Sequence, residues 1–200
     1  MSNPLRHRVA VLDTETTGLP SDPMARPIEL GAILLDVDGT EIGSFSTLMR
    51  PDVYDGEAAA GALAVNGIAE ADVLAAPGTA TVVQDFRDWL GAHECRFLTA
   101  FNVAFDREMM DRAGLRPNRH GLTWGPCVML RAAPPMARRG QLLPPKDDFI
   151  VRVDGQSWRP PALWKAAQFY GVQPEGAAHR ALTDARTAAL VLLALLREAP

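Results

Sequence analysis

Cysteine and long hydrophobic runs are scarce in this sequence. Only two cysteines are present, Cys95 and Cys127, and they form neither a CxxC pair nor a zinc-ligand pattern. No apolar run approaches the roughly 20 residues that a membrane-spanning helix needs. The first apolar run, residues 9–12, is too short for the core of a signal peptide. These absences argue against a disulfide-rich secreted protein and predict a soluble cytoplasmic protein with no membrane partner.

Positive charge is also scarce, because 20 basic residues face 24 acidic residues and leave a formal net charge of −4. The charge is unevenly distributed: residues 1–100 carry −9, residues 101–165 carry +5, and residues 166–200 are neutral. Only Lys146 and Lys165 are lysines, and arginine binds phosphate bidentately. The middle segment is therefore either a surface that meets a polyanion or a set of ordinary surface arginines.

The length of 200 residues and the hydrophobic content of 48% predict a single domain, residues 1–200, with a full core. A first apolar strand, followed by strands over 28–37 and 41–49, predicts an antiparallel meander that turns at Asp38-Gly39. The later pattern is of the α/β class. It predicts strands over 96–100 and 122–127, and helices near 57–60, 70–74, 79–90, 105–113, 128–133, 161–170 and 178–198.

Proline punctuates the segment before the last two predicted helices. Pro134-Pro135 is predicted to end the helix over 128–133, and residues 134–160 are predicted to form a long proline-rich loop within the domain. A long irregular stretch inside a compact domain is usually functional or mobile. Residues 141–145 are similar to a short sliding-clamp-binding peptide, but a match of this length is expected by chance.

Two carboxylates, Asp13 and Glu15, end the first predicted strand. Because side chains alternate along a strand, both leave it on the same side. Neighbouring carboxylates repel each other, and near a core each also loses solvation unless a positive charge neutralises it. A hard divalent cation such as Mg²⁺ suits such oxygen ligands, although solvated acids at a strand end are the alternative for this stretch alone.

Two later stretches carry further polar residues in apolar surroundings. Asn102 is expected to tie the turn between the strand over 96–100 and the next helix, and Asp106 lies in that helix's first turn, where the helix dipole favours an acid. Asp184 lies among alanines and leucines, where an unpaired aspartate is costly. His179 is expected on the loop or first turn before it.

The three stretches together resemble the motifs of one enzyme family. In order, they read Asp13-x-Glu15-Thr-Thr-Gly, Asn102-x-x-Phe105-Asp106 and His179-x-Ala181-x-x-Asp184-Ala185. They are similar to the three motifs of the DnaQ-like DEDDh 3′–5′ exonucleases. The resemblance implies a ribonuclease-H-like fold, a mixed five-stranded sheet flanked by helices. The related DEDDy subgroup has Tyr at the position of Arg180, so the histidine form is the match.

The resemblance also implies the roles of particular residues. Asp13, Glu15, Asp106 and Asp184 would hold two Mg²⁺ or Mn²⁺ ions, and His179 would be the general base that completes the catalytic set. The terminal nucleotide would bind at Thr16, Thr17, Gly18 and Leu19, with Asn102 and Phe105 in support. Glu29 is either near the nucleotide or a strand-edge charge. Phe101 stands where many members have His, a departure that concerns substrate preference.

The predicted function is therefore a metal-dependent 3′–5′ exonuclease. It would hydrolyse single-stranded or frayed nucleic-acid 3′ ends, DNA in preference to RNA, and release nucleoside 5′-monophosphates by a two-metal mechanism. The alternatives are an exoribonuclease that trims RNA or oligoribonucleotides, and a module that grips a nucleic-acid end without cutting. A haloacid-dehalogenase-like phosphatase is disfavoured because Glu15 stands where that class prefers Asp. DNA repair, proofreading with a polymerase or clamp partner, and RNA processing all remain open as roles.

Overall fold

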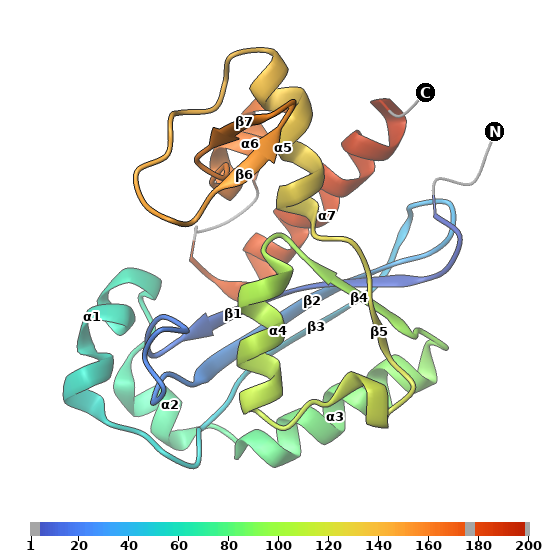
Figure 1. The fold of residues 1–200 in the computed structure, drawn as a ribbon. Helices are drawn as coiled ribbons and strands as arrows, with labels where there is room; N and C mark the ends of the chain where they lie inside the picture. The colour runs from blue at the N-terminus through green and yellow to red at the C-terminus, as the bar shows by residue number, and fades with distance from the viewer. Residues whose placement is uncertain (1–4, 175–178, 199–200) are drawn as a thin grey trace.

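A five-stranded mixed sheet forms the centre of the computed structural model, which describes residues 5–174 and 179–198 (Figure 1). The strand order is β3-β2-β1-β4-β5. The strands are β1 (Val9–Thr16), β2 (Pro27–Leu35), β3 (Glu41–Leu48), β4 (Phe97–Ala100) and β5 (Thr123–Trp124). β1, β2 and β3 pair antiparallel, whereas β4 pairs parallel to β1 and β5 parallel to β4. The predicted α/β fold, with its mixed sheet and initial meander, is confirmed.

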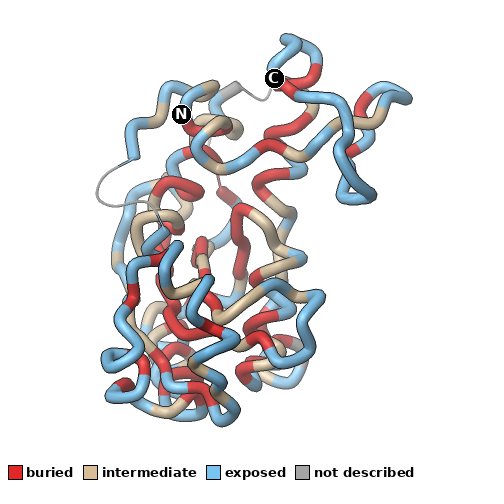
Figure 2. Tube along the Cα trace, turned by 90° about the vertical axis from the view of Figure 1, so that its left-hand side faces the viewer, coloured by how far each residue is buried: buried red, intermediate tan, exposed pale blue. Residues whose placement is uncertain are grey.

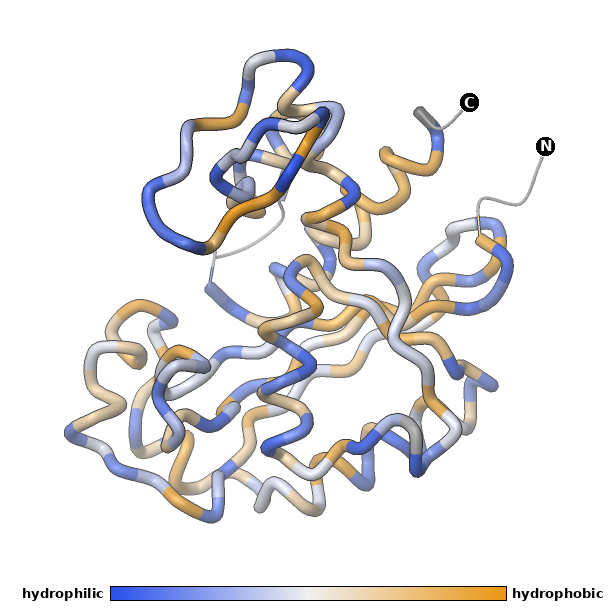
Figure 3. The backbone as a smooth tube through the Cα atoms, in the orientation of Figure 1, coloured by the Kyte–Doolittle hydropathy of each residue, from blue (hydrophilic) through white to orange (hydrophobic). Residues whose placement is uncertain are grey.

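Alternating side chains of β1 and β2 divide the core into two layers. Val11 and Ile33 face α7 (Ala181–Glu198), together with residues of α5 (Val128–Arg138) and α6 (Leu163–Phe169). Leu12 and Leu34 face the opposite layer, where α3 (Thr79–Ala92) and α4 (Val103–Arg112) lie. Every residue of β2 is buried, because helices cover both faces of the sheet around it. In Figure 2 buried residues gather inside the molecule and exposed residues lie on its outer loops. Hydrophobic residues accordingly run along the central strands and the second half of α7 (Figure 3).

The remaining helical elements are α1 (Gly56–Asn66), α2 (Glu70–Ala75) and a short 3₁₀ turn, η1 (Pro117–Arg119). Residues of α1 and α2 pack in a small separate cluster around Ile28. α1 is much longer than the single turn that was predicted. The Asp55 carboxylate caps its start by accepting hydrogen bonds from the N–H groups of Glu57 and Ala58 at 3.0 and 3.1 Å. Gly67, in the left-handed region, ends it. Its apolar residues do not gather on one face, which is why periodicity did not predict it.

The prediction that Pro134-Pro135 ends a helix is wrong, since α5 continues to Arg138 with both prolines inside it. A proline in a helix removes one hydrogen bond and crowds the preceding turn, at a cost of about 3 kcal/mol. Here the apolar stripe of α5 extends beyond the prolines, because Met136 and Ala137 are buried against the core. Burial of this last turn stabilises the helix against the local cost.

The prediction of one irregular loop over 134–160 is also wrong. After α5 and an extended loop, β6 (Val151–Val153) and β7 (Gln156–Trp158) pair as an antiparallel hairpin. Its turn is Asp154-Gly155, with φ of 50° and 81°, the positive values that a tight hairpin turn needs. The signal was present as an Asp-Gly pair between alternating residues. Three-residue strands were too short for the pattern to stand out.

The remaining elements differ from their predictions mainly at the ends. β5 contains only two residues, because Gly125 and Pro126 follow it and proline has no N–H for a strand ladder. α7 begins at Ala181 rather than at Ala178, which lies outside the described residues. None of the described helices is long and apolar enough to cross a membrane.

Candidate active site

The candidate residues meet at one edge of the sheet because β1 and β4 are parallel. Parallel strands have their carboxyl ends on the same edge. Asp13 and Glu15 lie in the last residues of β1, and α4, which carries Asp106, begins directly after β4. In Figure 1 the first turn of α7 lies at this same edge, close to the end of β1. The topology thus brings together the three stretches that sequence motifs singled out.

Three carboxylates form a cluster at this edge. Asp13, Glu15 and Asp184 each offer an oxygen, and the three oxygens lie within 4.8 Å of one another. Asp13 and Glu15 continue the side of β1 on which Val11 packs against α7. Asp184, in the first turn of α7, therefore lies directly over them. All three side chains are half-buried, so the site is open to a ligand on one side.

Asp106 lies beside this cluster but is held separately. It is only 2% exposed. One of its carboxylate oxygens, Oδ1, accepts hydrogen bonds from the backbone N–H and the hydroxyl of Thr14, both at 3.0 Å. Thr14 follows Asp13, so this pair of bonds fixes α4 against the end of β1. The structure therefore brings all four predicted acids to one place, with three in direct proximity and the fourth anchored next to them.

Burial disfavours the ionised form of these acids. It is the main cause that raises the pKa of Asp13 well above its usual range, with the charges of Asp106 and Asp184 adding to it. It also raises the pKa values of Glu15 and Asp106 to about 7, and it raises that of Asp184. Protons or cations must offset this repulsion. A set of carboxylate oxygens suits a hard divalent cation, and Asp13, Glu15 and Asp184, with Asp106 beside them, fit such an ion.

Gly31 allows α7 to approach the cluster. It lies opposite Asp13 in the β1–β2 pairing. A Cβ built on Gly31 would be 2.2 Å from the backbone nitrogen of Leu182, which is a severe clash with a rigid helix turn. Only glycine lets the first turn of α7 lie directly on β2. Gly31 thereby sets how close Asp184 comes to Asp13, a role that the motifs did not indicate.

Glu29 holds the start of α7, so the alternative prediction of a strand-edge charge is wrong, because the side chain is buried. Its place near the nucleotide stays a prediction. Its side chain is 3% exposed and forms an ion pair with Arg180 at 2.6 Å. The same carboxylate accepts a hydrogen bond from the backbone N–H of Ala181 at 3.0 Å. An acid at a helix start is stabilised by the free N–H groups there. We call this arrangement the Glu29–Arg180 clamp.

His179 lies immediately before α7, on the loop side of the helix start as predicted. Its side chain is exposed, and its backbone is in the left-handed region with φ of 61°. A residue other than glycine adopts this conformation only where the surroundings hold it there. The backbone N–H of His179 donates a hydrogen bond to the Asp184 carboxylate. The histidine is thus attached to the acidic cluster through its own main chain.

The loop after β1 carries the residues predicted to bind the terminal nucleotide. The Thr16 hydroxyl donates to the carbonyl of Gly18 at 2.7 Å, and the Thr17 hydroxyl accepts from the N–H of Arg26 at 2.9 Å. These bonds fold the loop back on itself. Leu19 projects from it with 67% of its surface exposed.

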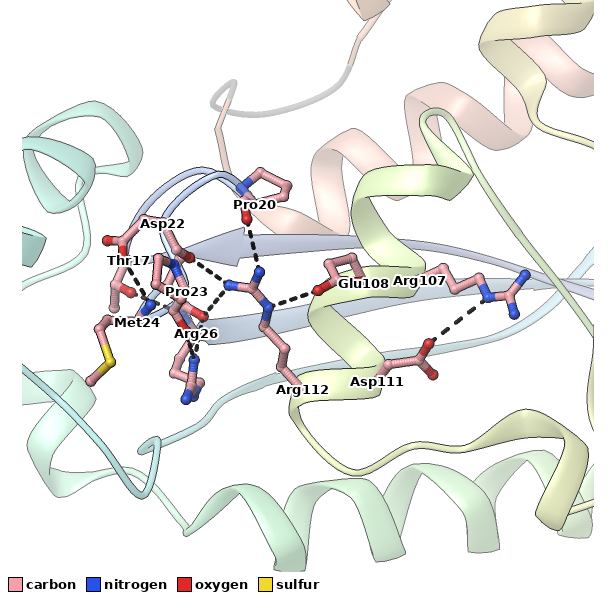
Figure 4. Close-up of polar contacts among 11 residues, drawn as sticks. Thr17, Pro20, Asp22, Pro23, Met24, Arg26, Arg107, Glu108, Asp111 and Arg112 are labelled. Carbon is pink, nitrogen blue, oxygen red and sulfur yellow. Dashed lines mark hydrogen bonds and ion pairs between the residues drawn. The ribbon is translucent and has the colours of Figure 1, made fainter.

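Arg112, on α4, holds this loop from the other side (Figure 4). Its guanidinium donates to the backbone carbonyls of Pro20, Asp22 and Ala25 at 2.7–3.0 Å, and it pairs with Glu108 at 3.0 Å. A guanidinium can satisfy several carbonyls at once because its donors are arranged as a rigid fork. The predicted nucleotide loop is therefore attached to the helix that carries Asp106. No sequence motif pointed to Arg112.

Asn102 ties the turn before α4 through its backbone rather than its side chain. Its carbonyl accepts hydrogen bonds from the N–H groups of Phe105 and Asp106 at 3.0 and 3.1 Å. The side-chain oxygen is buried and has no partner among the described residues. Asn102 therefore ties the turn as predicted, and it does so through its main-chain carbonyl. Phe105, one residue before Asp106, is half-buried.

Comparison with known families gives a match over the first part of the chain, which includes Asp13, Glu15 and Asp106. The profile of an exonuclease family, RNase_T, matches residues 10–119, which is more than half of the chain. The chain belongs to this exonuclease family. The resemblance predicted from the three motifs is confirmed, and the fold is that of the DEDDh nucleases in the ribonuclease-H-like group. A comparison with curated proteins gave no match.

Solved structures give the same fold. One is a 3′-exonuclease in specific recognition of the 3′ end of a histone mRNA stem-loop (TM-score 0.70, 15% identity, covering 97% of this chain and 65% of that one). Another is the nuclease domain of 3′hExo, a DEDDh family member, bound to rAMP (TM-score 0.66, 16% identity, covering 96% of this chain and 92% of that one). A third is E. coli exonuclease I in complex with a dT13 oligonucleotide (TM-score 0.65, 20% identity, covering 96% of this chain and 41% of that one). At these identities the likeness establishes the fold alone.

Proposed function

We propose that this exonuclease removes nucleotides from the 3′ end of single-stranded or frayed nucleic acid and releases nucleoside 5′-monophosphates. The observation that carries the proposal is the cluster of Asp13, Glu15 and Asp184, with Asp106 anchored beside it. Burial raises the pKa values of all four acids, and repulsion between carboxylates adds to it, so their gathering at the end of the central strand is costly unless a ligand offsets the charge. Such carboxylates suit the binding of cations, which would in turn contact the phosphodiester of the substrate.

Asp13, Glu15, Asp106 and Asp184 would hold two Mg²⁺ or Mn²⁺ ions. Ions bound there would neutralise the carboxylates and the charge that develops on the attacking and leaving oxygens of a phosphodiester. His179, exposed at the start of α7, would take the proton from the attacking water as general base. Leu19 would pack against the terminal base while the backbone around Thr16 and Gly18 contacts the 3′ hydroxyl.

The finer part of the proposal concerns the substrate. The protein would cleave DNA faster than RNA. Exonuclease I is described with dT13, whereas 3′hExo is described with rAMP. Exoribonuclease activity is thus the second candidate. A protein tells RNA from DNA by whether its pocket admits the 2′ hydroxyl, so the ratio of the two rates decides between them. A non-cutting module is disfavoured, because such a protein has no use for a full set of acids with a histidine.

The test uses matched 5′-labelled single-stranded DNA and RNA oligomers with Mg²⁺, Mn²⁺ or EDTA. We expect a ladder that shortens from the 3′ end with either metal and no product in EDTA. Asp184→Asn, which removes the charge but little volume, should lower the rate by at least about 100-fold. Asp88→Asn, on the exposed side of α3, is the matched control. Equal rates for Asp184→Asn and wild type would remove the assignment.

A further inference from the structure

A groove lies beside the candidate active site, between the start of α4, α5 and the segment that contains the β6–β7 hairpin. It has a volume of about 560 Å³. Its floor is apolar, because Phe101, Met129 and Leu142 contribute to it and all three are buried. In Figure 1 the hairpin and the long loop before it extend over the edge of the sheet at which α4 begins. Figure 3 shows a hydrophobic stretch where this loop enters β6.

The rim of the groove exposes large apolar side chains. Trp164 is 61% exposed, Phe149 is 55% exposed and Leu143 is 50% exposed. Single exposed apolar residues need no explanation, but several that share one groove indicate a surface that a ligand covers. Two of the three are aromatic, and aromatic faces are stacking platforms for nucleobases. Folding of the described residues leaves these rings uncovered.

Basic residues accompany the aromatic rings. Arg159 and Lys165 both line the groove, and the Lys165 ammonium lies 5.3 Å from the centre of the Trp164 ring. In the part of the chain that the structure describes, neither residue forms an ion pair with a carboxylate. Asp147 is the one acid among the lining residues, so the groove has a net positive charge. This is the part of the chain, residues 101–165, in which basic residues outnumber acids.

One end of the groove reaches the start of the helix that carries Asp106. Asn102 lines the groove, and the carbonyl of the same residue accepts the backbone N–H of Asp106 at 3.1 Å. This end of the groove thus lies within one helical turn of Asp106, the acid that is anchored beside the cluster. A strand whose last phosphodiester reaches the acids would pass this point, and its preceding nucleotides would lie next to the aromatic rim.

We propose that this groove binds the nucleotides that precede the terminal one on a single-stranded substrate. Their bases stack on Trp164 and Phe149, and their phosphates pair with Arg159 and Lys165. The inference rests on the proposed function for the direction of the strand, but binding in the groove is measurable without cleavage. It gives the segment between α5 and α6 a role, which is to hold the strand while its end is cut.

The test compares dT3 with dT15, labelled at the 5′ end. For Trp164→Ala we expect kcat/KM on dT15 to fall about 5- to 100-fold, the range for loss of one stacked base, while dT3 changes less than about twofold. Trp164→Phe should restore most of the rate. Leu130→Ala, at a half-exposed apolar residue on α5 outside the groove, is the matched control.

Binding is measured separately in EDTA, by fluorescence anisotropy of dT15. Trp164→Ala should raise Kd by a similar factor. Arg159→Gln should reduce the slope of log K against log salt by about 0.7, the value for one phosphate contact on a single strand. Arg152→Gln, exposed on β6 outside the groove, should leave this slope unchanged.

The outcomes separate the two proposals. If wild type cleaves neither oligomer but binds dT15 through Trp164, the groove assignment stands and the proposed function fails. If wild type cleaves both oligomers and Trp164→Ala lowers both rates equally, the groove is not a strand site. Unchanged binding of dT15 by both groove variants would likewise overturn the proposal and leave the patch to a protein partner.

Discussion

Among single residues, His179 is the clearest case in which an unfavourable backbone conformation points to a functional role. Its side chain is exposed while its backbone has a φ of 61°, which is unfavourable for a residue with a Cβ. The main-chain bond from His179 to Asp184 and the neighbouring Glu29–Arg180 clamp both hold it in place. An exposed histidine whose backbone is held in place can contact a ligand that binds at the acidic cluster.

His179→Ala should therefore lower kcat by about 100- to 10,000-fold, the usual contribution of a general base. The melting temperature of the variant should stay close to that of wild type, because the change removes only an exposed side chain. His120→Ala, far along the chain, serves as the control. Single-turnover cleavage of dT15 is the measurement, and a loss below about threefold would assign proton transfer to another group.

At the level of secondary structure, α7 decides the geometry of the site. Three features position its first turn: the glycine at position 31, the bond from Ala181 to Glu29, and the ion pair of Glu29 with Arg180. None of them contacts the reacting atoms. They act through Asp184, which lies in this turn, and through His179, which lies just before it.

Arg180→Ala should leave the buried Glu29 carboxylate without its ion-pair partner. We expect a loss of about 1–3 kcal/mol in the free energy of unfolding, reduced from the full penalty because Arg180 itself is 47% exposed. The rate should fall at least about tenfold through displacement of α7. Urea unfolding and kcat are the measurements.

The matched control for this change is Arg138→Ala, which removes a surface ion pair with Asp154. Such a pair contributes about 0–1 kcal/mol, and it lies away from α7. The double variant Glu29→Gln/Arg180→Ala should recover part of the stability, because no unpaired charge remains. Equal losses for Arg138→Ala and Arg180→Ala would show that the clamp has no special role.

For the molecule as a whole, the acidic cluster couples folding to pH and to cations. Glu15 and Asp106 have pKa values of about 7 in the folded protein, above their ordinary values near 4. Between pH values of about 4 and about 7, the folded state therefore binds more protons than the unfolded state. Stability without metal therefore falls as the pH rises through this window.

In EDTA, the free energy of unfolding should decrease by about 1–3 kcal/mol between pH 5 and pH 8. Mg²⁺ or Mn²⁺ at pH 8 should restore it, because cations bind the ionised carboxylates of the folded state only. Urea titrations at each pH test this. Asp184→Asn should flatten the pH dependence and weaken the metal effect. A stability that rises up to pH 8 without metal would contradict the expected coupling.

The amino-acid sequence by itself determined the exonuclease family and the broad fold. Asp13, Glu15 and Asp184 were recognisable because carboxylates at a strand end and in an apolar helix are costly without a ligand. The Asp38-Gly39 turn and the meander followed from local turn chemistry and alternation. Such signals lie within a few residues of each other, so they are readable along the chain.

Only the tertiary structure decided how these parts are held and what surrounds them. Glu29 and Arg180 are 151 residues apart, so nothing local shows that they pair. Gly31 matters because another helix comes to lie on it, and α5 passes through two prolines because its far end is buried. The groove likewise combines Asn102 with Trp164 from a distant helix. Contacts between distant segments depend on how the chain packs, and local patterns do not contain that information.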